Sequence, residues 1–219
     1  MSSIMQHENY YVMRNFKYQI IGGKIINMAP LASPNHGKIS NRVNIVLSNY
    51  FDKIGEDYEV YHDNNYLRID MIAKKNNIIL PDECKNDKFR PDVMVIRDRS
   101  IDTVKGVIGA PVIVVEVLSK GTEDYDTQLK KQVYELIGVQ EYWIVNPGLK
   151  SINIYVLKDG KYISYKTYCK YSESELEEIE DERQKTGKVF DEVILEFSPY
   201  SFPELKIKID DIFKNLIKE

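Results

Sequence analysis

Two apolar runs in the middle of the chain each carry one acidic residue. Residues 111–118 read Pro-Val-Ile-Val-Val-Glu-Val-Leu, and residues 92–96 read Asp-Val-Met-Val-Ile. Uninterrupted Val, Ile and Leu predict strands that are buried on both faces. Ionising a lone carboxylate there costs on the order of 3–5 kcal/mol unless a cation or hydrogen-bond donors meet it. We therefore expect Glu116 to have a partner, and Asp92 to lie at the mouth of a neighbouring strand.

The N-terminal part of the chain predicts a hairpin followed by a helix. Residues 16–21 and 24–28 flank Gly22-Gly23, and paired glycines supply the positive φ angles that a two-residue turn requires. Ser33 followed by Pro34 is typical of a helix start, with a capping side chain and then a proline in the first turn. The helix has one apolar stripe that we expect to pack on a sheet, formed by Ile39, Val43, Val46, Leu47 and Tyr50.

Between this helix and Asp92 the pattern predicts short strands. They are placed at residues 58–61, 66–71 and 78–80, with a turn at 74–77 before the last of them. We expect these strands to lead into the strand that Asp92 begins.

After Glu116 the pattern predicts a second helix, which begins at Thr122 and ends at Gly138. A strand over residues 141–146 follows, and the order strand, helix, strand predicts a parallel crossover. Asp159-Gly160 is typical of a two-residue hairpin turn between two further strands. The acidic stretch after this hairpin reads as a solvated helix or loop, and a short amphipathic helix ends the chain. The helix between Thr122 and Gly138 directs these apolar residues inward: Tyr125, Leu129, Val133, Leu136 and Ile137. The final helix does so with Ile209, Ile212, Phe213 and Leu216.

The chain offers no boundary between two domains. No linker rich in Gly, Ser or Pro interrupts its 219 residues, so we expect a single domain over residues 1–219 with a short C-terminal extension. Its apolar runs are shorter than the ~20 residues of a membrane span. Cys84 and Cys169 have neither metal-site spacing nor the density of a disulfide scaffold, and the first residues lack the pattern of a signal peptide. We therefore expect a cytoplasmic protein with free thiols and no membrane partner.

The net charge limits how the chain can meet nucleic acid. It is −4 at neutral pH, with a pI near 5.6, whereas non-specific affinity for DNA comes from many Lys and Arg contacts to phosphates. Residues 173–182 contain seven acids, and the rest of the chain is slightly positive without them. A nucleic-acid partner therefore requires a local basic patch.

Asp92 and Glu116 have the chemistry of a divalent-metal site. Mg²⁺ prefers a few carboxylate oxygens and carbonyls and keeps several waters. Two acids at neighbouring strand ends provide this set, with the carbonyl of Val117 as a third ligand. A bound metal lowers the pKa of a water and neutralises a phosphodiester under attack. The alternatives are a turn carboxylate beside Arg90 for Asp92 and a buried ion pair for Glu116.

Three polar residues recur every four positions in the second helix: Asp126, Lys130 and Tyr134. The simplest interpretation is a surface pair between Asp126 and Lys130, worth about 0.3–0.5 kcal/mol. Because the helix returns over the sheet from the loop after Glu116, its polar strip can instead face the strand ends. Lys130 could then hold an attacking water or stabilise the charge that develops on a phosphate. Lys131 lies off this strip.

Other polar residues near these positions are candidates for supporting roles. His36, in the first turn of the first helix, can approach the site as a base or phosphate contact, or can simply cap the helix. Ser119 and Thr122 lack the glycines of a nucleophile elbow or a phosphate loop. We interpret them as turn and N-cap residues that orient the site.

Taken together, these residues resemble a known nuclease family. The set is similar to that of the Uma-type family of restriction-endonuclease-like proteins, a branch of the PD-(D/E)xK nuclease superfamily, and the likeness covers nearly the whole chain. In the superfamily a lysine commonly stands two residues after the second acid, where this chain has Leu118. The Uma-type pattern places it on the following helix, which corresponds to Lys130. The matching residues are Arg90-Pro-Asp92, the run Gly109 to Ser119 with Glu116, Thr122, Asp126, Lys130, Tyr134, and the run Gly138 to Trp143.

The resemblance implies an α/β restriction-endonuclease-like fold with a mixed β-sheet flanked by helices, dependence on Mg²⁺ or Mn²⁺, and a DNA-directed activity. Asp92, Glu116 and Lys130 are then the catalytic residues. We predict a metal-dependent endonuclease acting on DNA as a homodimer, because cutting both strands of a duplex favours a symmetric dimer. One alternative is a nuclease-derived protein that binds nucleic acid or acts as a scaffold without turnover. Another is a phosphatase or nucleotide hydrolase, which the lack of a glycine-rich phosphate loop disfavours.

Overall fold

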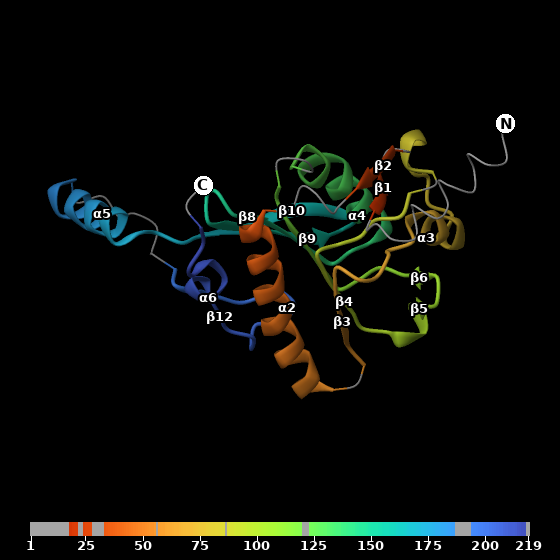
Figure 1. Ribbon diagram of the computed structural model, residues 1–219, viewed down its shortest axis with the longest axis horizontal. Helices are drawn as coiled ribbons and strands as arrows, with labels where there is room; N and C mark the ends of the chain where they lie inside the picture. Colours follow the sequence, from red (N-terminus) through yellow and green to blue (C-terminus); the bar gives the residue numbers. More distant parts are fainter. Residues whose placement is uncertain are drawn as a thin grey trace.

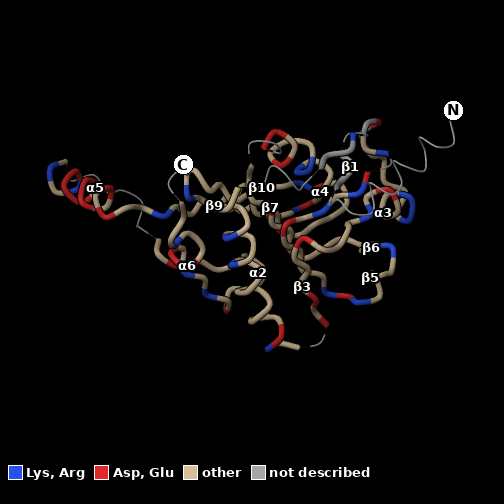
Figure 2. The backbone as a smooth tube through the Cα atoms, in the orientation of Figure 1, with Lys and Arg blue, Asp and Glu red and all other residues tan. Residues whose placement is uncertain are grey.

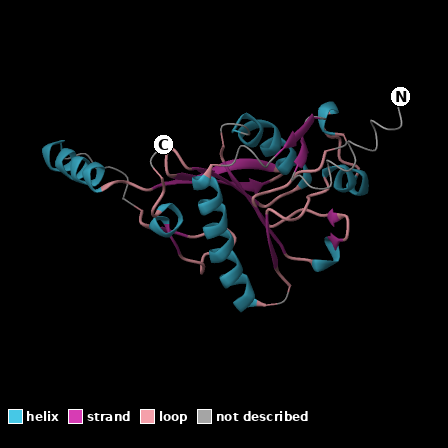
Figure 3. Ribbon diagram, viewed as in Figure 1, coloured by secondary structure: helices cyan, strands magenta, loops and turns pink. Residues whose placement is uncertain are grey.

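A six-stranded mixed sheet forms the centre of the protein. The computed structural model describes residues 18–21, 24–27, 33–55, 57–85, 87–119, 123–186 and 194–217. The strand order is β10-β9-β8-β7-β4-β3, and every neighbouring pair is antiparallel except β7 and β8, which are parallel. Figures 1 and 3 show helices on both faces of this sheet, so the predicted mixed α/β fold is confirmed. The strands are β3 (Glu59–His62), β4 (Val93–Ile96), β7 (Ile113–Val117), β8 (Glu141–Asn146), β9 (Ser151–Lys158) and β10 (Lys161–Cys169).

The two faces of the sheet bury two separate apolar clusters. Helix α2 (Pro34–Ile54) packs on one face through its predicted stripe, together with Ile113, Val115 and Val117 of β7. The other face is covered by α3 (Ile69–Asn76) and by a helix made of η3 (Tyr125–Lys130) and α4 (Lys131–Ile137). Successive side chains of a strand point to opposite faces. Glu116 therefore lies on the face of β7 that η3 and α4 cover.

The two predicted hairpins and the predicted start of the first helix are confirmed, although Gly22-Gly23 itself lies outside the described residues. Strands β1 (Tyr18–Ile21) and β2 (Lys24–Asn27) pair as an antiparallel hairpin. Helix α2 begins at Pro34, and the Ser33 hydroxyl accepts a hydrogen bond from the backbone N–H of His36 at 3.2 Å. Asp159 and Gly160 both have positive φ, 50° and 75°, as the predicted hairpin turn requires.

The predictions between β3 and β4 are wrong in two places. Residues 69–76 form α3, where a strand over 66–71 and a turn at 74–77 were expected, and residues 78–80 form no strand. Ile69, Ile72 and Ala73 are the buried positions of α3, which is helical spacing rather than alternation. Asn77 ends the helix in the left-handed region, with φ 55°. Leu136 is also misplaced by the sequence pattern, because 37% of it is exposed.

The C-terminal segment is divided between an exposed helix and a packed tail. Helix α5 (Glu173–Thr186) has no buried residue and projects away from the sheet (Figure 1). Residues 194–217 include β11 (Glu196–Phe197), β12 (Ile207–Lys208) and α6 (Ile209–Phe213). Their apolar side chains, including Phe197 and Phe213, join the same cluster as α2. This tail therefore helps to build the core.

The remaining described elements are small. Strands β5 (Asp102–Thr103) and β6 (Gly106–Val107) form a hairpin, and η1 (Asp82–Cys84) and η2 (Arg99–Ile101) are single turns. None of the described helices is long and apolar enough to cross a bilayer. Cys84 is buried and Cys169 is partly buried, and the described residues form no disulfide with either.

Candidate active site

Asp92 and Glu116 stand opposite each other on neighbouring strands. In the antiparallel pairing of β4 and β7, Val93 lies opposite Val115. The next position of this register matches Asp92 with Glu116, and residues directly opposite in an antiparallel pair share one face. Both side chains are buried, with 3% and 2% exposed. The sheet thus brings the two predicted acids to one end of β7, on the side of η3 and α4.

Donors from two other elements hold Asp92. The backbone N–H of Val117 donates to Asp92 Oδ2 at 2.7 Å, and His36 Nε2 lies 3.1 Å from the same oxygen. Val117 follows Glu116 in β7, and His36 is in the first turn of α2. The carboxylate of Asp92 therefore links β4, β7 and the N-terminus of α2.

Lys130 and Tyr134 both contact Glu116. Lys130 Nζ lies 2.9 Å from Glu116 Oε1, and the Tyr134 hydroxyl donates to that same oxygen at 2.7 Å. Lys130 Nζ is also 2.8 Å from Asp126 Oδ1. The Lys130 side chain is 1% exposed. The polar strip predicted for this helix is thus directed inward, and the alternative of a surface pair is wrong.

A π-helical segment sets the register of this strip. Residues 125–130 form i→i+5 hydrogen bonds and continue directly into α4. Such wide turns are rare and occur frequently at functional sites. The Tyr142 hydroxyl of β8 donates to the Asp126 carbonyl at 2.8 Å, and the Tyr134 ring packs edge-on against Phe89 and Tyr142. The helix is therefore fixed to the sheet on both sides of Lys130.

Burial and charge shift the pKa values of Glu116, Lys130 and His36 in this cluster. Burial raises the pKa of the Glu116 carboxyl to about 8 against the opposing charge of Lys130, and the carboxylates of Asp126 and Asp92 add to the rise. Burial lowers the pKa of Lys130, but its two carboxylate partners outweigh that effect and the net shift is upward. The pKa of His36 is likewise raised, because its contact with Asp92 and the nearby carboxylates outweigh burial. The cluster thus favours additional positive charge.

Each of the two strand acids has one carboxylate oxygen that meets no protein donor among the described residues. Among the described residues, the donors recorded for Glu116 all meet Oε1, and those recorded for Asp92 all meet Oδ2. One oxygen of each carboxylate therefore remains available to a metal that needs few protein ligands, as Mg²⁺ does. In the described part of the chain, no group of three or more His, Cys, Asp or Glu side chains is arranged to hold a metal. The two carboxylates could supply two oxygen ligands, and ligation of a metal by Asp92, Glu116 and the Val117 carbonyl stays a prediction.

Comparison with known proteins identifies the family. A family model described as "Uma2: Putative restriction endonuclease" matches residues 6–184. The chain belongs to the Uma2 family. A solved structure described as a putative nuclease from Anabaena variabilis ATCC 29413 has a similar fold, with a TM-score of 0.56 and 18% sequence identity over 90% of this chain and 89% of that chain. A search of curated proteins gave no match to this chain.

In this Uma2 chain some of the residues predicted for supporting roles contact the strand acids and others do not. His36 and Tyr134 contact the strand acids, as described above. The Ser119 carbonyl accepts from the Glu123 N–H at 3.1 Å and so caps the helix start, while Thr122 lies outside the described residues. The Val117 N–H holds Asp92, and ligation by the Val117 carbonyl stays a prediction.

Two structural features of the Uma2 chain were not predicted from its sequence. The π-helical segment left no pattern beyond the four-residue spacing of its polar residues. Glu141 is fully buried in β8, where it accepts hydrogen bonds from Trp143 Nε1 at 3.1 Å and from the backbone N–H groups of Tyr200 and Ser201. A lone Glu before an apolar strand was its signal. Its partners tie the C-terminal segment to the sheet.

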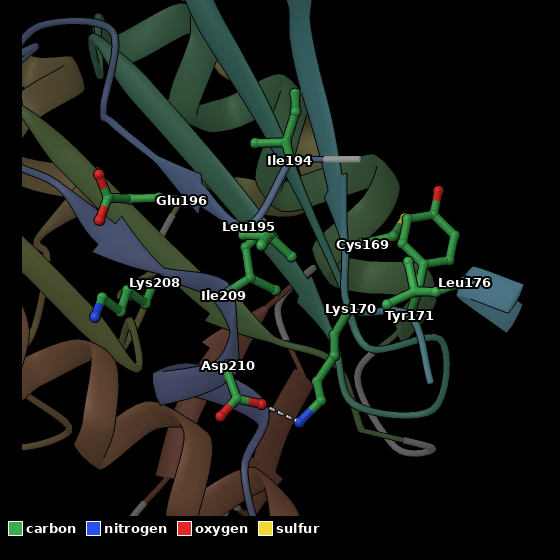
Figure 4. A pocket seen from close by; sticks show the side chains of 10 residues that line it. All are labelled: Cys169, Lys170, Tyr171, Leu176, Ile194, Leu195, Glu196, Lys208, Ile209 and Asp210. Carbon is green, nitrogen blue, oxygen red and sulfur yellow. Dashed lines mark hydrogen bonds and ion pairs between the residues drawn. The ribbon is translucent and has the colours of Figure 1, made fainter. Parts of the chain in front are cut away.

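An apolar cavity lies apart from these acids, beside the C-terminal segment (Figure 4). It has a volume of about 360 Å³, and none of the predicted site residues lines it. The Lys170 side chain at its edge is paired with Asp210. The lining residues are Cys169, Lys170, Tyr171, Leu176, Ile194, Leu195, Glu196, Lys208, Ile209 and Asp210.

Proposed function

We propose that this Uma2 chain is a metal-dependent endonuclease that hydrolyses phosphodiester bonds of DNA. The family and the fold support a restriction-endonuclease-like nuclease. The observation that carries the proposal is the buried contact of Lys130 Nζ with Glu116 Oε1 at 2.9 Å. It brings a cation to the acid that stands opposite Asp92, although Leu118 occupies the position where the superfamily commonly has its lysine.

The metal is Mg²⁺ or Mn²⁺ in this proposal. Asp92 and Glu116 would hold it through the carboxylate oxygens that face no recorded protein donor, with the Val117 carbonyl as a third ligand. When bound, it would supply Lewis-acid stabilisation of the phosphodiester and a water of lowered pKa. The pKa of Glu116 is raised mainly by burial and further by the carboxylates of Asp126 and Asp92. A metal would offset the charge of these carboxylates but would have to displace the proton, because a carboxyl ligand must be deprotonated.

Lys130 is the cation that the chain itself contributes. Its raised pKa keeps the ammonium protonated at neutral pH. Three donors on one ammonium allow Lys130 to retain Asp126 while it holds an attacking water or meets the charge developing on the phosphate. Asp126 then fixes the direction of the ammonium, and Tyr134 fixes the Glu116 carboxylate.

His36 is placed to act at the other strand acid. Its ring is partly exposed, at 13%, while Nε2 contacts Asp92. From the N-terminus of α2 it can orient Asp92 and meet a substrate phosphate, since both the ring and the helix N-terminus favour an anion.

A protein that binds nucleic acid without turnover is the second candidate. The exposures of 3% and 2% at Asp92 and Glu116 favour it, because a closed site admits a phosphodiester only after local opening. The two candidates differ in their response to metal. Hydrolysis requires it, whereas backbone binding does not.

Cleavage of supercoiled plasmid DNA tests the proposal. We expect nicked or linear products with Mg²⁺ or Mn²⁺ and none with EDTA. Glu116→Gln should abolish cleavage and weaken Mn²⁺ binding, measured by calorimetry, by at least about tenfold. Glu135→Gln is a matched control, since Glu135 lies in α4 but pairs with Lys161 at the surface. Wild-type protein that binds DNA but cuts nothing with either metal would establish the second candidate.

A further inference from the structure

A second cavity lies beside the N-terminus of α2, the helix end that also carries His36. It has a volume of about 520 Å³ and lies between the N-terminus of α2, the β8–β9 connection and the C-terminal segment. Asn35 lines it, and the adjacent residue His36 contacts Asp92. The full lining is Asn35, Pro147, Gly148, Lys150, Lys170, Phe213, Asn215, Leu216 and Ile217.

The sheet places this cavity at the same edge as the strand acids. Strands β7 and β8 are parallel, and Val117 lies opposite Val145. Residues 147–150, which follow β8, therefore leave the sheet at the end where Glu116 and Val117 lie. The N-terminus of α2 connects the strand acids and the cavity, because His36 contacts Asp92 and the adjacent Asn35 lines the cavity.

Basic side chains gather around the cavity in a chain that is acidic as a whole. Lys150 is exposed, and no ion pair of its Nζ is recorded among the described residues. Lys38 Nζ donates to the Asn215 carbonyl at 3.2 Å, and Arg42 Nη1 donates to the Lys214 carbonyl. The first turn of α2 contains no acid that would oppose an anion.

The acidic side chains near this cavity form ion pairs with nearby lysines. Asp210 pairs with Lys170 (Figure 4), and Asp211 pairs with Lys214 at 2.9 Å. The charge of Lys150 is among the causes that lower the pKa of Glu175, at the start of α5. Other acids of α5 lie further along this helix, which projects away from the sheet (Figure 2).

We propose that this cavity and its rim bind the phosphate backbone of a DNA strand next to the cleaved phosphodiester, with Lys38 and Lys150 as the phosphate contacts. The proposal rests on the proposed function for the position of the substrate. Asn35 contributes indirectly, because its amide is bonded at 2.8 Å to both the N–H and the carbonyl of Ile217 and so shapes the wall.

Phosphate contacts have a measurable signature. Each Lys or Arg that neutralises a phosphate releases counterions, so the logarithm of affinity falls with the logarithm of salt concentration by about 0.9 per contact. Such a contact also acts on every DNA sequence equally. This cavity would therefore give a chain of net charge −4 the local basic patch that DNA binding requires.

Fluorescence anisotropy with a labelled DNA duplex in EDTA tests the proposal while hydrolysis is blocked. The double variant Lys38→Gln/Lys150→Gln should lose about tenfold in affinity at low salt and reduce the salt slope by about 2. Lys105→Gln is the control, because Lys105 is an exposed lysine in the β5–β6 turn, away from α2. Thermal melting of each variant should match wild type.

The outcomes separate this proposal from the proposed function. An unchanged salt slope in the double variant would overturn the proposed phosphate contacts, as would an equal loss of DNA affinity in Lys105→Gln. Loss of binding confined to the double variant would support it even if the wild-type protein cut no DNA with any metal. If the double variant cleaved DNA normally and kept the wild-type salt slope, the nuclease proposal would stand, but this cavity would have no part in DNA binding.

Discussion

Lys130 reaches Glu116 from the helix that follows the strand: it lies 14 positions later in the chain, and its Nζ is 2.9 Å from Glu116 Oε1. Leu118, two residues after Glu116, is 8% exposed and belongs to the apolar cluster under α4. The strand therefore contributes packing where the superfamily commonly has a lysine. The helix supplies the cation in its place, and the consequence for catalysis can be measured.

Lys130→Met should lower turnover on plasmid DNA by roughly 10²- to 10³-fold, because the methionine keeps the volume but removes the cation. It should also destabilise the fold, since removing one partner of a buried ion pair costs about 3–5 kcal/mol. Initial cleavage rates, at a temperature where melting curves show the variant folded, measure the effect.

Lys131→Ala is the matched control. Lys131 Nζ lies 3.7 Å from the centre of the Tyr155 ring, a contact worth about 0.5–1 kcal/mol. We expect slightly lower stability and unchanged turnover. Equal cleavage by Lys130→Met and wild type would remove Lys130 from the mechanism.

Tyr134→Phe should weaken metal binding while the fold stays intact. The variant loses only the hydroxyl that donates to Glu116 Oε1, so a hydrogen bond worth about 1.5–3 kcal/mol is lost and Lys130 alone holds the carboxylate. Loss of a residue that orients a metal ligand typically costs 10- to 100-fold in affinity or activity. Calorimetric titration with Mn²⁺ measures this directly. Tyr162→Phe, which loses a hydroxyl bonded to the Val139 carbonyl, is the control.

The stability of the metal-free protein should fall as pH rises from about 5 to about 9. The pKa of Glu116 is raised from 4.5 to about 8, so the folded state binds a proton that the unfolded state has released. This stabilisation is complete below the ordinary pKa and is lost as pH rises through the folded value. The raised pKa of His36 acts in the same direction.

Melting curves across this range, measured in EDTA, test the pH dependence. Glu116→Gln should flatten most of the slope, and His36→Gln should remove only the smaller part. A wild-type melting temperature that rises with pH would contradict the assignment of a retained proton to Glu116.

A homodimer is expected if the protein cuts both strands of a duplex, because two active sites related by a two-fold axis match the symmetry of the DNA. Light scattering during size-exclusion chromatography should give about twice the chain mass of 25.6 kDa. Cleavage of plasmid directly to the linear form should accompany it. A mass of one chain throughout, with nicking only, would show that the protein acts as a monomer.

The central strands and the candidate acids could be predicted from the sequence, because local patterns determine them. A carboxylate in an apolar run, such as Glu116, is a strong signal whatever surrounds it. Ser33-Pro34 and Asp159-Gly160 act through backbone geometry within a few residues. Residues 66–71 were misassigned because a short apolar segment fits both a strand and a helix until packing selects one.

Only the tertiary structure decided which of these residues meet. Whether Asp126 and Lys130 form a surface pair or a buried one depends on the π-helical segment and on the sheet beneath it, which spacing alone does not reveal. Glu141 is buried because residues 200 and 201, about 60 positions later, supply its donors. Local propensity determines single elements, whereas burial and ion pairing arise from contacts between segments far apart in the chain.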